Sequence, residues 1–302
     1  MLIVTHDACL GHEPGDLHPE SPARLRAVRA GIDDFMADHE VAVHEAPRVT
    51  REALLRVHNA AYLERLERQF PDERTVQLDP DTFISPGSRE AVYRAAGAVE
   101  YAVERVLAGD EQRVFCAVRP PGHHAEPDLA MGFCLFNNVA VGAAAALAGG
   151  LQRVAIVDFD VHHGNGTETM FGGDERVLFC SLFQHPLYPD SGLSPAANCV
   201  FVPLDAGTDG AAYREAFGTR VEPALASFAP ELIFISAGFD AHAGDPLAGL
   251  LLEDDDYIWL TERIVAQANI SAQSRVISLL EGGYNLEALR SATHAHLQAL
   301  SQ

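Results

Sequence analysis

The sequence predicts an α/β fold with three layers, in which a mostly parallel sheet is covered by helices on both faces. Short runs of β-branched and apolar residues alternate along the chain with longer segments whose apolar residues recur at helical spacing. This is the pattern of parallel strands joined by crossover helices. The chain has 302 residues, of which 48% are hydrophobic, enough for one large core. Because no internal repeat or linker interrupts the pattern, we expect a single domain over residues 1–302.

A capping residue marks each helix expected in the first third of the chain. Ser21 precedes a proline at the first helical position, Thr50 precedes a helical pattern that continues towards Phe70, and Ser88 begins a long helix that ends at Gly109. Residues 2–5 and 41–43 are predicted strands. The segment 71–88 is rich in proline, aspartate and glycine, so we expect a surface loop without a regular element.

The rest of the chain alternates between the two kinds of element. Buried strands are predicted at residues 114–118, 154–158, 177–182, 200–204, 231–238 and 276–280. Helices are predicted at residues 138–149 and 211–228, around Trp259, Ile264 and Val265, and after Asn285, which caps the terminal helix.

Residues suited to chemistry follow four of these strands. His123 and His124 stand in a proline-rich turn after residues 114–118, and the central strand leads to Asp160 and His162. The two remaining strands end before Asp240 and Tyr284, respectively. In open parallel sheets ligands bind at the carboxyl ends of the strands, so we expect these side chains to meet there.

Asp160, His162 and Asp240 are the candidate metal ligands. Asp160 and His162 are two positions apart, so on an extended chain both point to the same side, whereas His163 faces away and is expected to be structural. Two carboxylates and one imidazole leave a position open for water or substrate, as in catalytic sites. Zinc is our first choice, and Fe²⁺, Co²⁺ or Mn²⁺ suit the same donors. Such an ion makes bound water ionisable near neutral pH and polarises a carbonyl.

The two adjacent histidines suit a proton-handling pair. One of His123 and His124 would take a proton from water, and the other would donate to a leaving group or stabilise charge. Asp158 and Asn165 flank the ligand strand and are candidates for fixing the histidine tautomers. Tyr284 follows two glycines that allow a close approach, so it would donate its hydroxyl to a developing oxyanion.

Composition limits the partners and the compartment. The formal charge is −22 and all 21 basic residues are arginines, which excludes a Schiff-base lysine or a Walker-type phosphate lysine. The acidity argues against nucleic acid as a partner, and no apolar run is long enough for a membrane span. The five cysteines are scattered and expected to be reduced. With no leader-like segment after Met1, we expect a cytoplasmic protein; the oligomeric state stays open.

Five motifs, in this order, resemble the signature set of the histone deacetylase family, which includes acetylpolyamine amidohydrolases and acetoin-utilization proteins. The motifs occupy residues 121–125 (PGHHA), 132–134 (GFC), 158–166 (DFDVHHGNG), 237–242 (AGFDAH) and 281–284 (EGGY), and the resemblance extends from the segment 18–24 (HPESPAR) to the terminal helix. It implies an arginase-like α/β fold and metal-dependent hydrolysis of an acyl amide. The implied roles are metal ligands for Asp160, His162 and Asp240, acid and base for the histidine pair, and carbonyl polarisation for Tyr284. Asn165 resembles the class II branch.

The resemblance also implies a substrate tunnel and a structural potassium ion. The implied tunnel residues are Gly132 and Phe133 on one wall, Leu187 or Tyr188 opposite, Leu247, and an acidic loop residue, Asp79 or Asp81, that would hold the substrate amide. Leu247 stands where polyamine-selective members carry a glutamate. Potassium would be held by Asp158, Ser181, Leu182 and the backbone around Asp160 and His162.

Two departures from the family concern the rim of this tunnel. Phe183 stands where a histidine usually follows Ser-Leu, and the glycine-rich segment after Pro189 is reduced to Asp190-Ser191-Gly192. Beside a deacylase of small or peptide N-acyl substrates, three alternatives stay open. They are an acetylpolyamine amidohydrolase, a ureohydrolase resembling arginase, which needs two manganese ions and further aspartates, and a non-catalytic module that binds an acyl ligand.

Overall fold

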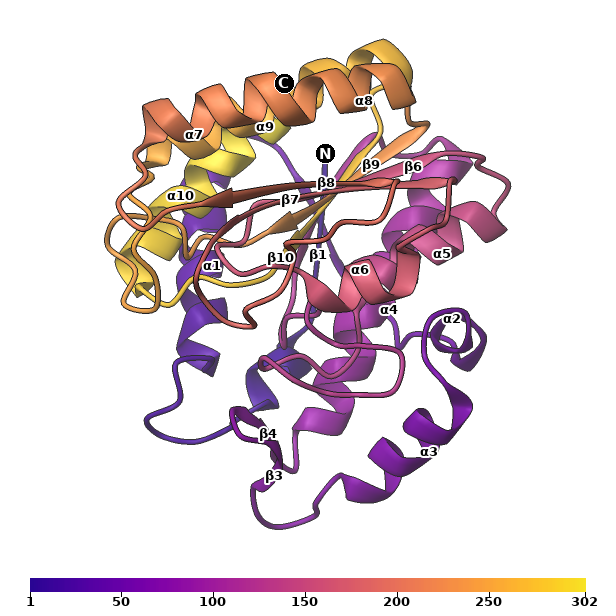
Figure 1. Cartoon of the computed structure of the whole chain (residues 1–302). Helices are drawn as coiled ribbons and strands as arrows, with labels where there is room; N and C mark the ends of the chain where they lie inside the picture. The colour runs from indigo at the N-terminus through magenta and orange to yellow at the C-terminus, as the bar shows by residue number, and fades with distance from the viewer.

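The computed structural model describes residues 1–302, and its centre is one sheet of eight parallel strands in the order β2-β1-β5-β10-β9-β6-β7-β8 (Figure 1). The strands are β1 (Leu2–Thr5), β2 (Ala42–Glu45), β5 (Arg113–Ala117), β6 (Val154–Asp158), β7 (Val177–Gln184), β8 (Cys199–Leu204), β9 (Leu232–Ala237) and β10 (Val276–Leu280). Every neighbouring pair is parallel. The predicted α/β fold is confirmed.

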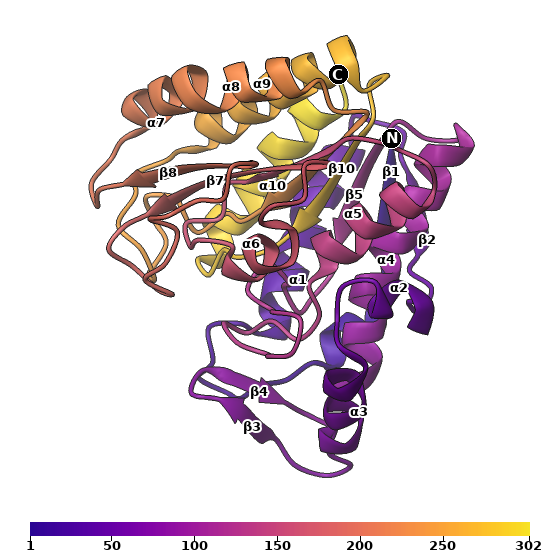
Figure 2. The same cartoon turned by 45° about the vertical axis from the view of Figure 1, so that its right-hand side comes forward.

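Helices cover both faces of the sheet (Figures 1 and 2). On one face, α1 (Pro22–Met36), α9 (Asp254–Ser271) and α10 (Leu286–Leu300) pack together, with α7 (Gly210–Ala216) and α8 (Glu222–Phe228) beside α9. The other face carries α4 (Ser88–Ala108), α5 (Asn138–Ala148) and α6 (Asn165–Phe171). None of the helices combines the length and the apolarity that crossing a bilayer requires.

A second, smaller core lies beyond α4. It joins α2 (Arg51–Leu55) and α3 (Ala60–Gln69) to α4 through buried side chains that include Leu54, Tyr62 and Phe136. A 3₁₀ turn (Asp7–Gly11) packs against the same helix. Figure 2 shows α3 and the hairpin of β3 (Val76–Asp79) and β4 (Thr82–Ile84) projecting away from the sheet.

That hairpin corrects one prediction, because the segment 71–88 was expected to hold no regular element. β3 and β4 pair antiparallel with a register shift between Gln77 and Asp79. Thr82 and Ile84 are buried, so two inward-facing residues are enough to fold a stretch whose composition is that of a loop. Ser88 is also not a cap: Gly87 holds that position, and the Ser88 hydroxyl instead accepts the backbone N–H of Ser85 at 2.7 Å.

The predicted helix 211–228 is interrupted. A π-helical turn at Phe217–Val221 separates α7 from α8. Pro223 stands at the start of α8 and has no N–H to donate to the preceding turn, which accounts for the break in the regular hydrogen-bond ladder.

The topology places four neighbouring strands where the chemistry gathers. β5, β10, β9 and β6 lie side by side, and every residue of these strands is buried. The segments that leave their carboxyl ends carry His123, Tyr284, Asp240 and Asp160, respectively. A rigid, fully packed sheet therefore holds these four segments in a fixed relation.

Candidate metal centre and active site

Asp160, His162 and Asp240 converge beyond the ends of β6 and β9. One ligand atom from each lies within 4.8 Å of the other two. His162 Nδ1 is 3.0 Å from Asp160 Oδ1 and 3.2 Å from Asp240 Oδ2. Both carboxylates are buried, and the His162 side chain is 12% exposed. The structure thus brings together the three residues that the sequence singled out as metal ligands.

The electrostatics of this cluster fit a cation. Asp240 Oδ2 is buried and accepts no well-aligned hydrogen bond. Burial alone would lower the pKa of His162, but the two carboxylates outweigh it and raise the pKa to about 10. Two buried carboxylates around one imidazole leave excess negative charge, which in proteins is compensated by a partner or a metal. These residues fit a divalent ion.

Gly282 closes the far side of the cluster. Its backbone N–H donates to Asp160 Oδ2 at 2.8 Å, and a β-carbon at this position would overlap the carboxylates of both Asp160 and Asp240. The glycine is therefore required for the β10 turn to approach the carboxylates.

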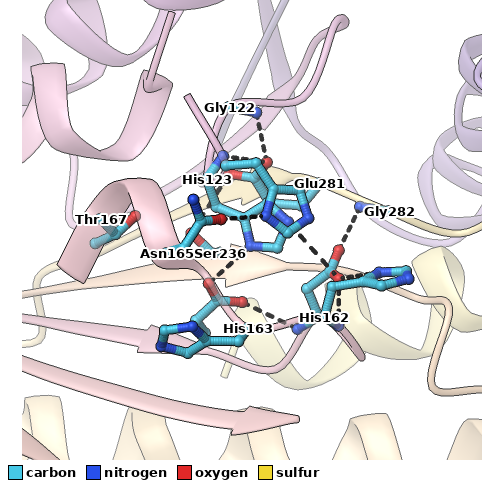
Figure 3. A network of polar contacts seen from close by, with 12 residues as sticks. Gly122, His123, His162, His163, Asn165, Thr167, Ser236, Glu281 and Gly282 are labelled. Carbon is cyan, nitrogen blue, oxygen red and sulfur yellow. Dashed lines mark hydrogen bonds and ion pairs between the residues drawn. The ribbon is translucent and has the colours of Figure 1, made fainter. Parts of the chain in front are cut away.

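The two adjacent histidines have different polar partners, and Figure 3 shows His123 among its neighbours. His123 Nδ1 is 2.9 Å from Asp158 Oδ2, and His124 Nδ1 is 2.8 Å from Asn165 Oδ1. Burial disfavours the charged form of both rings. For His123, the carboxylates of Asp160 and Asp158 outweigh burial and hold its pKa well above the ordinary value. For His124, burial and the neighbouring histidines hold its pKa well below that value. The pair is therefore split into a ring that keeps a proton and a ring that can accept one.

Tyr284 is oriented by contacts on both its backbone and its ring. Arg24 donates from Nε to the Gly283 carbonyl at 2.6 Å, and its guanidinium lies 4.8 Å from the centre of the Tyr284 ring. Asp245 Oδ2 accepts the Tyr284 backbone N–H at 2.7 Å. Burial raises the pKa of Tyr284 well above its ordinary value, so the hydroxyl stays protonated and can donate a hydrogen bond.

A pocket of about 240 Å³ leads from the surface to this cluster. Its lining is mostly apolar and consists of Asp81, His124, Gly132, Phe133, His162, Leu187, Tyr188, Leu247 and Tyr284. The rings of Phe133 and Tyr284 are 5.8 Å apart, and that of Tyr188 is 5.2 Å from His124. A mostly apolar pocket with a few polar groups in its lining suits an aliphatic chain with a reactive polar end.

The comparisons with known proteins agree with this geometry. The family model described as histone deacetylase domain matches residues 18–300. The chain is 40% identical to a histone deacetylase-like amidohydrolase of Pseudomonas aeruginosa, over 89% of the chain and 73% of that protein. Among solved structures, it is similar to the crystal structure of the HDA15 HD domain, with a TM-score of 0.92 and 33% sequence identity. The match covers 99% of the chain and 89% of that structure.

The chain belongs to the histone deacetylase family. It is also 34% identical to type-2 histone deacetylase 2 of Dictyostelium discoideum, but it spans only 20% of that protein's length. Membership of the histone deacetylase family makes the chain a hydrolase of C–N bonds.

The residues that the histone deacetylase resemblance assigned to a tunnel lie together around this pocket. Asp81 lines the pocket, whereas Asp79 does not. Asp81 Oδ1 accepts the backbone N–H of Gly132 at 3.1 Å, so two lining residues are tied to each other. Phe183, which replaces the usual histidine, is 1% exposed and packs against His163 at 4.8 Å between ring centres. The substituted side chain is therefore buried and does not line the pocket.

Three supporting residues were not assigned roles from sequence. Glu281, fully buried, accepts the backbone N–H groups of Gly122 and His123 at 2.7 and 3.2 Å, and burial raises its pKa to about 7. Arg24 and Asp245 hold the Tyr284 turn, as described above. Arg24 stands within a motif of the family resemblance, but no local pattern shows that its partner lies 259 residues away.

Proposed function

We propose that this histone deacetylase family member is a zinc-dependent deacylase that hydrolyses the amide of an acetyl-lysine-like or related small N-acyl substrate. The observation that supports it most is that catalytic groups of three kinds gather at one pocket. His162, His124 and Tyr284 line this pocket, Asp160 and Asp240 lie beside His162, and the pKa values of the two histidines are shifted in opposite directions. This combination is what attack of water on an amide carbonyl requires.

Each group has a distinct task in this proposal. Asp160, His162 and Asp240 would hold zinc, which when bound supplies water activation and carbonyl polarisation. Neutral His124 would accept the proton of the attacking water. Protonated His123, held by Asp158 at 2.9 Å, would stabilise negative charge near the carbonyl.

Tyr284, which also lines the pocket, completes the set. Its protonated hydroxyl would donate to the acyl oxygen as negative charge develops there. The leaving amine must gain a proton, and His124, having taken one from water, is the group placed in the pocket to return it.

The pocket wall favours a neutral aliphatic arm. Leu247 lines it where polyamine-selective members carry a glutamate, and the one carboxylate of the lining, Asp81, already accepts the Gly132 backbone N–H, so the acetylpolyamine alternative is the weaker one. A ureohydrolase would need ligands for two ions, and Asp160, His162 and Asp240 form the only such cluster of three or more His, Cys, Asp or Glu side chains.

A monovalent cation and a compartment complete the proposal. Ser181 is paired with Asp158 in the β6–β7 register, and its hydroxyl is buried without a partner. An oxygen-lined position of this kind fits potassium held by Asp158, Ser181 and Leu182. All five cysteines are free and buried, which is consistent with a reducing cytoplasm.

The test uses the zinc-loaded chain and a panel of acetyl-lysine peptide, trifluoroacetyl-lysine peptide, acetylputrescine and acetylspermidine, each with and without a hydroxamate. We expect hydroxamate-sensitive cleavage of the lysine peptides. Calorimetry should show one zinc per chain, lost in Asp240→Ala. Zinc bound as expected with no member of the panel cleaved would overturn the deacylase and leave an acyl-binding module.

A further inference from the structure

The side-chain amide of Asn165 has all its hydrogen-bonding groups committed. Its Oδ1 lies 2.8 Å from His124 Nδ1, while its Nδ2 lies 2.9 Å from Glu126 Oε1 and 3.4 Å from the sulfur of Met131. Asn165 is buried, and Glu126 is half-buried at the end of the His123-His124 turn. Hydrogen bonds therefore connect three side chains in series, from the partly solvated Glu126 carboxylate through Asn165 to the His124 imidazole.

The Glu126 carboxylate fixes which group is the donor in each hydrogen bond of this series. An ionised glutamate only accepts hydrogen bonds, so the NH₂ group of Asn165 must face Glu126 and the carbonyl oxygen must face His124. His124 Nδ1 then has to carry the hydrogen. In the neutral ring the other nitrogen, Nε2, is left as a free acceptor, which is the state that a general base needs.

The backbone of Glu126 is fixed on both sides. Its N–H donates to the carbonyl of Leu129 at 2.9 Å, and its own carbonyl accepts from His58 Nδ1 at 3.1 Å. The carboxylate is therefore held beside Asn165 and does not follow a mobile loop. No arginine or histidine forms an ion pair with the Glu126 carboxylate, so its charge acts on the Asn165 amide.

We propose that Glu126 is a positioning residue that sets the tautomer of His124 through the Asn165 amide. This inference rests on the proposed hydrolytic role of His124. In Glu126→Gln the neighbour of Asn165 can both donate and accept, so the amide can rotate and present NH₂ to His124. The imidazole then carries its hydrogen on Nε2 and cannot accept a proton there.

The effect of Glu126→Gln on kcat/KM should change sign in an Asn165→Asp background, which a purely structural role of Glu126 would not cause. In Asn165→Asp, residue 165 is a carboxylate that needs no orienting partner, and it stands beside the Glu126 carboxylate. Two like charges at hydrogen-bond distance disfavour each other. In that background Glu126→Gln replaces a repulsion with a hydrogen bond.

The experiment is a double-mutant cycle in kcat/KM on the zinc-loaded enzyme. We expect Glu126→Gln to lower kcat/KM about ten-fold in the parent, as loss of an orienting partner typically does, and to raise it in the Asn165→Asp background. Asp128→Asn, which removes one exposed charge from the same turn, should change neither value. A loss of similar size in both backgrounds would overturn the proposal.

A second measurement needs no turnover and keeps the two proposals apart. Ring ¹⁵N shifts of His124 should report the Nδ1–H tautomer in the parent and a mixture in Glu126→Gln; an unchanged tautomer would overturn the inference. If thermal unfolding shows that Asn165→Asp does not fold, the ¹⁵N measurement still tests the role of Glu126, because it needs only the parent and Glu126→Gln. A parent that cleaves nothing contradicts the deacylase, whereas an active parent with no sign reversal contradicts only the role of Glu126.

Discussion

Tyr284 can act at the pocket because its surroundings fix its ring and keep its hydroxyl protonated. We predict that Tyr284→Phe lowers kcat about 100- to 1,000-fold, the usual cost of removing one oxyanion donor, while zinc affinity and hydroxamate binding change little. Tyr257→Phe is the matched control, because the Tyr257 hydroxyl is buried without a partner; its kcat should stay within two-fold, or about 0.4 kcal/mol. Equal turnover by Tyr284→Phe and the parent would remove the tyrosine from the reaction.

Among single residues, the candidate metal ligands that follow strands could be predicted from the sequence, but the partners of the residues that support the site could not. Asp160, His162 and Asp240 could be proposed because each comes directly after a buried run, where parallel sheets collect ligands. The partners of Arg24 and Glu281 could not, since these buried charges contact backbone groups 259 and 159 residues away. Such pairings follow from the packing of whole elements and leave no local period in the sequence.

At the scale of elements, Asp245 joins two segments that line the pocket, one through Leu247 and the other through Tyr284. Its carboxylate accepts the backbone N–H groups of Leu247 at 2.9 Å, Tyr284 at 2.7 Å and Asn285 at 3.3 Å. The loop after β9 and the turn after β10 are therefore held in one relation by a single, largely buried side chain.

We predict that Asp245→Ala lowers kcat/KM about ten-fold and the free energy of unfolding by about 2 kcal/mol, the scale of hydrogen bonds to a charged group. For Asp245→Asn, which keeps one acceptor oxygen, both kcat/KM and the free energy of unfolding should lie between those of Asp245→Ala and the parent. Asp209→Ala removes an exposed cap of α7 and should lower stability by about 1 kcal/mol without affecting kcat/KM. Steady-state kinetics and urea unfolding measure both effects; parent-like kinetics in Asp245→Ala would refute the clamp.

The elements that sequence reasoning missed share a physical cause. β3 and β4 are four and three residues long, too short to establish a two-residue period amid prolines and aspartates. The π-helical turn before α8 keeps a helical apolar pattern, so periodicity alone cannot separate it from a continuous helix. The long central strands were predictable because burial on both faces leaves unbroken apolar runs.

At the scale of the whole molecule, the fold buries several histidines in their neutral form. Burial lowers the pKa values of His12, His58 and His163 to about 4 and that of His296 to about 3, against an ordinary value of 6.5. Because the folded chain binds these protons less readily than the unfolded chain, their contribution to stability is complete above pH 6.5. It is lost as the pH falls from 6.5 towards 4.

The contribution of a single histidine to the pH dependence of stability can be measured at His58. Its Nδ1 donates to the Glu126 carbonyl at 3.1 Å and its Nε2 accepts from Asn137 N–H at 3.0 Å, so protonation would break the second bond. Between pH 4.5 and 6 we expect the free energy of unfolding of the parent to rise with pH. In His58→Gln that slope should be smaller by about 1.4 kcal/mol per pH unit, the value for one proton. Urea unfolding across this range provides the test, and parallel curves for the two proteins would show that His58 is not held neutral by the fold.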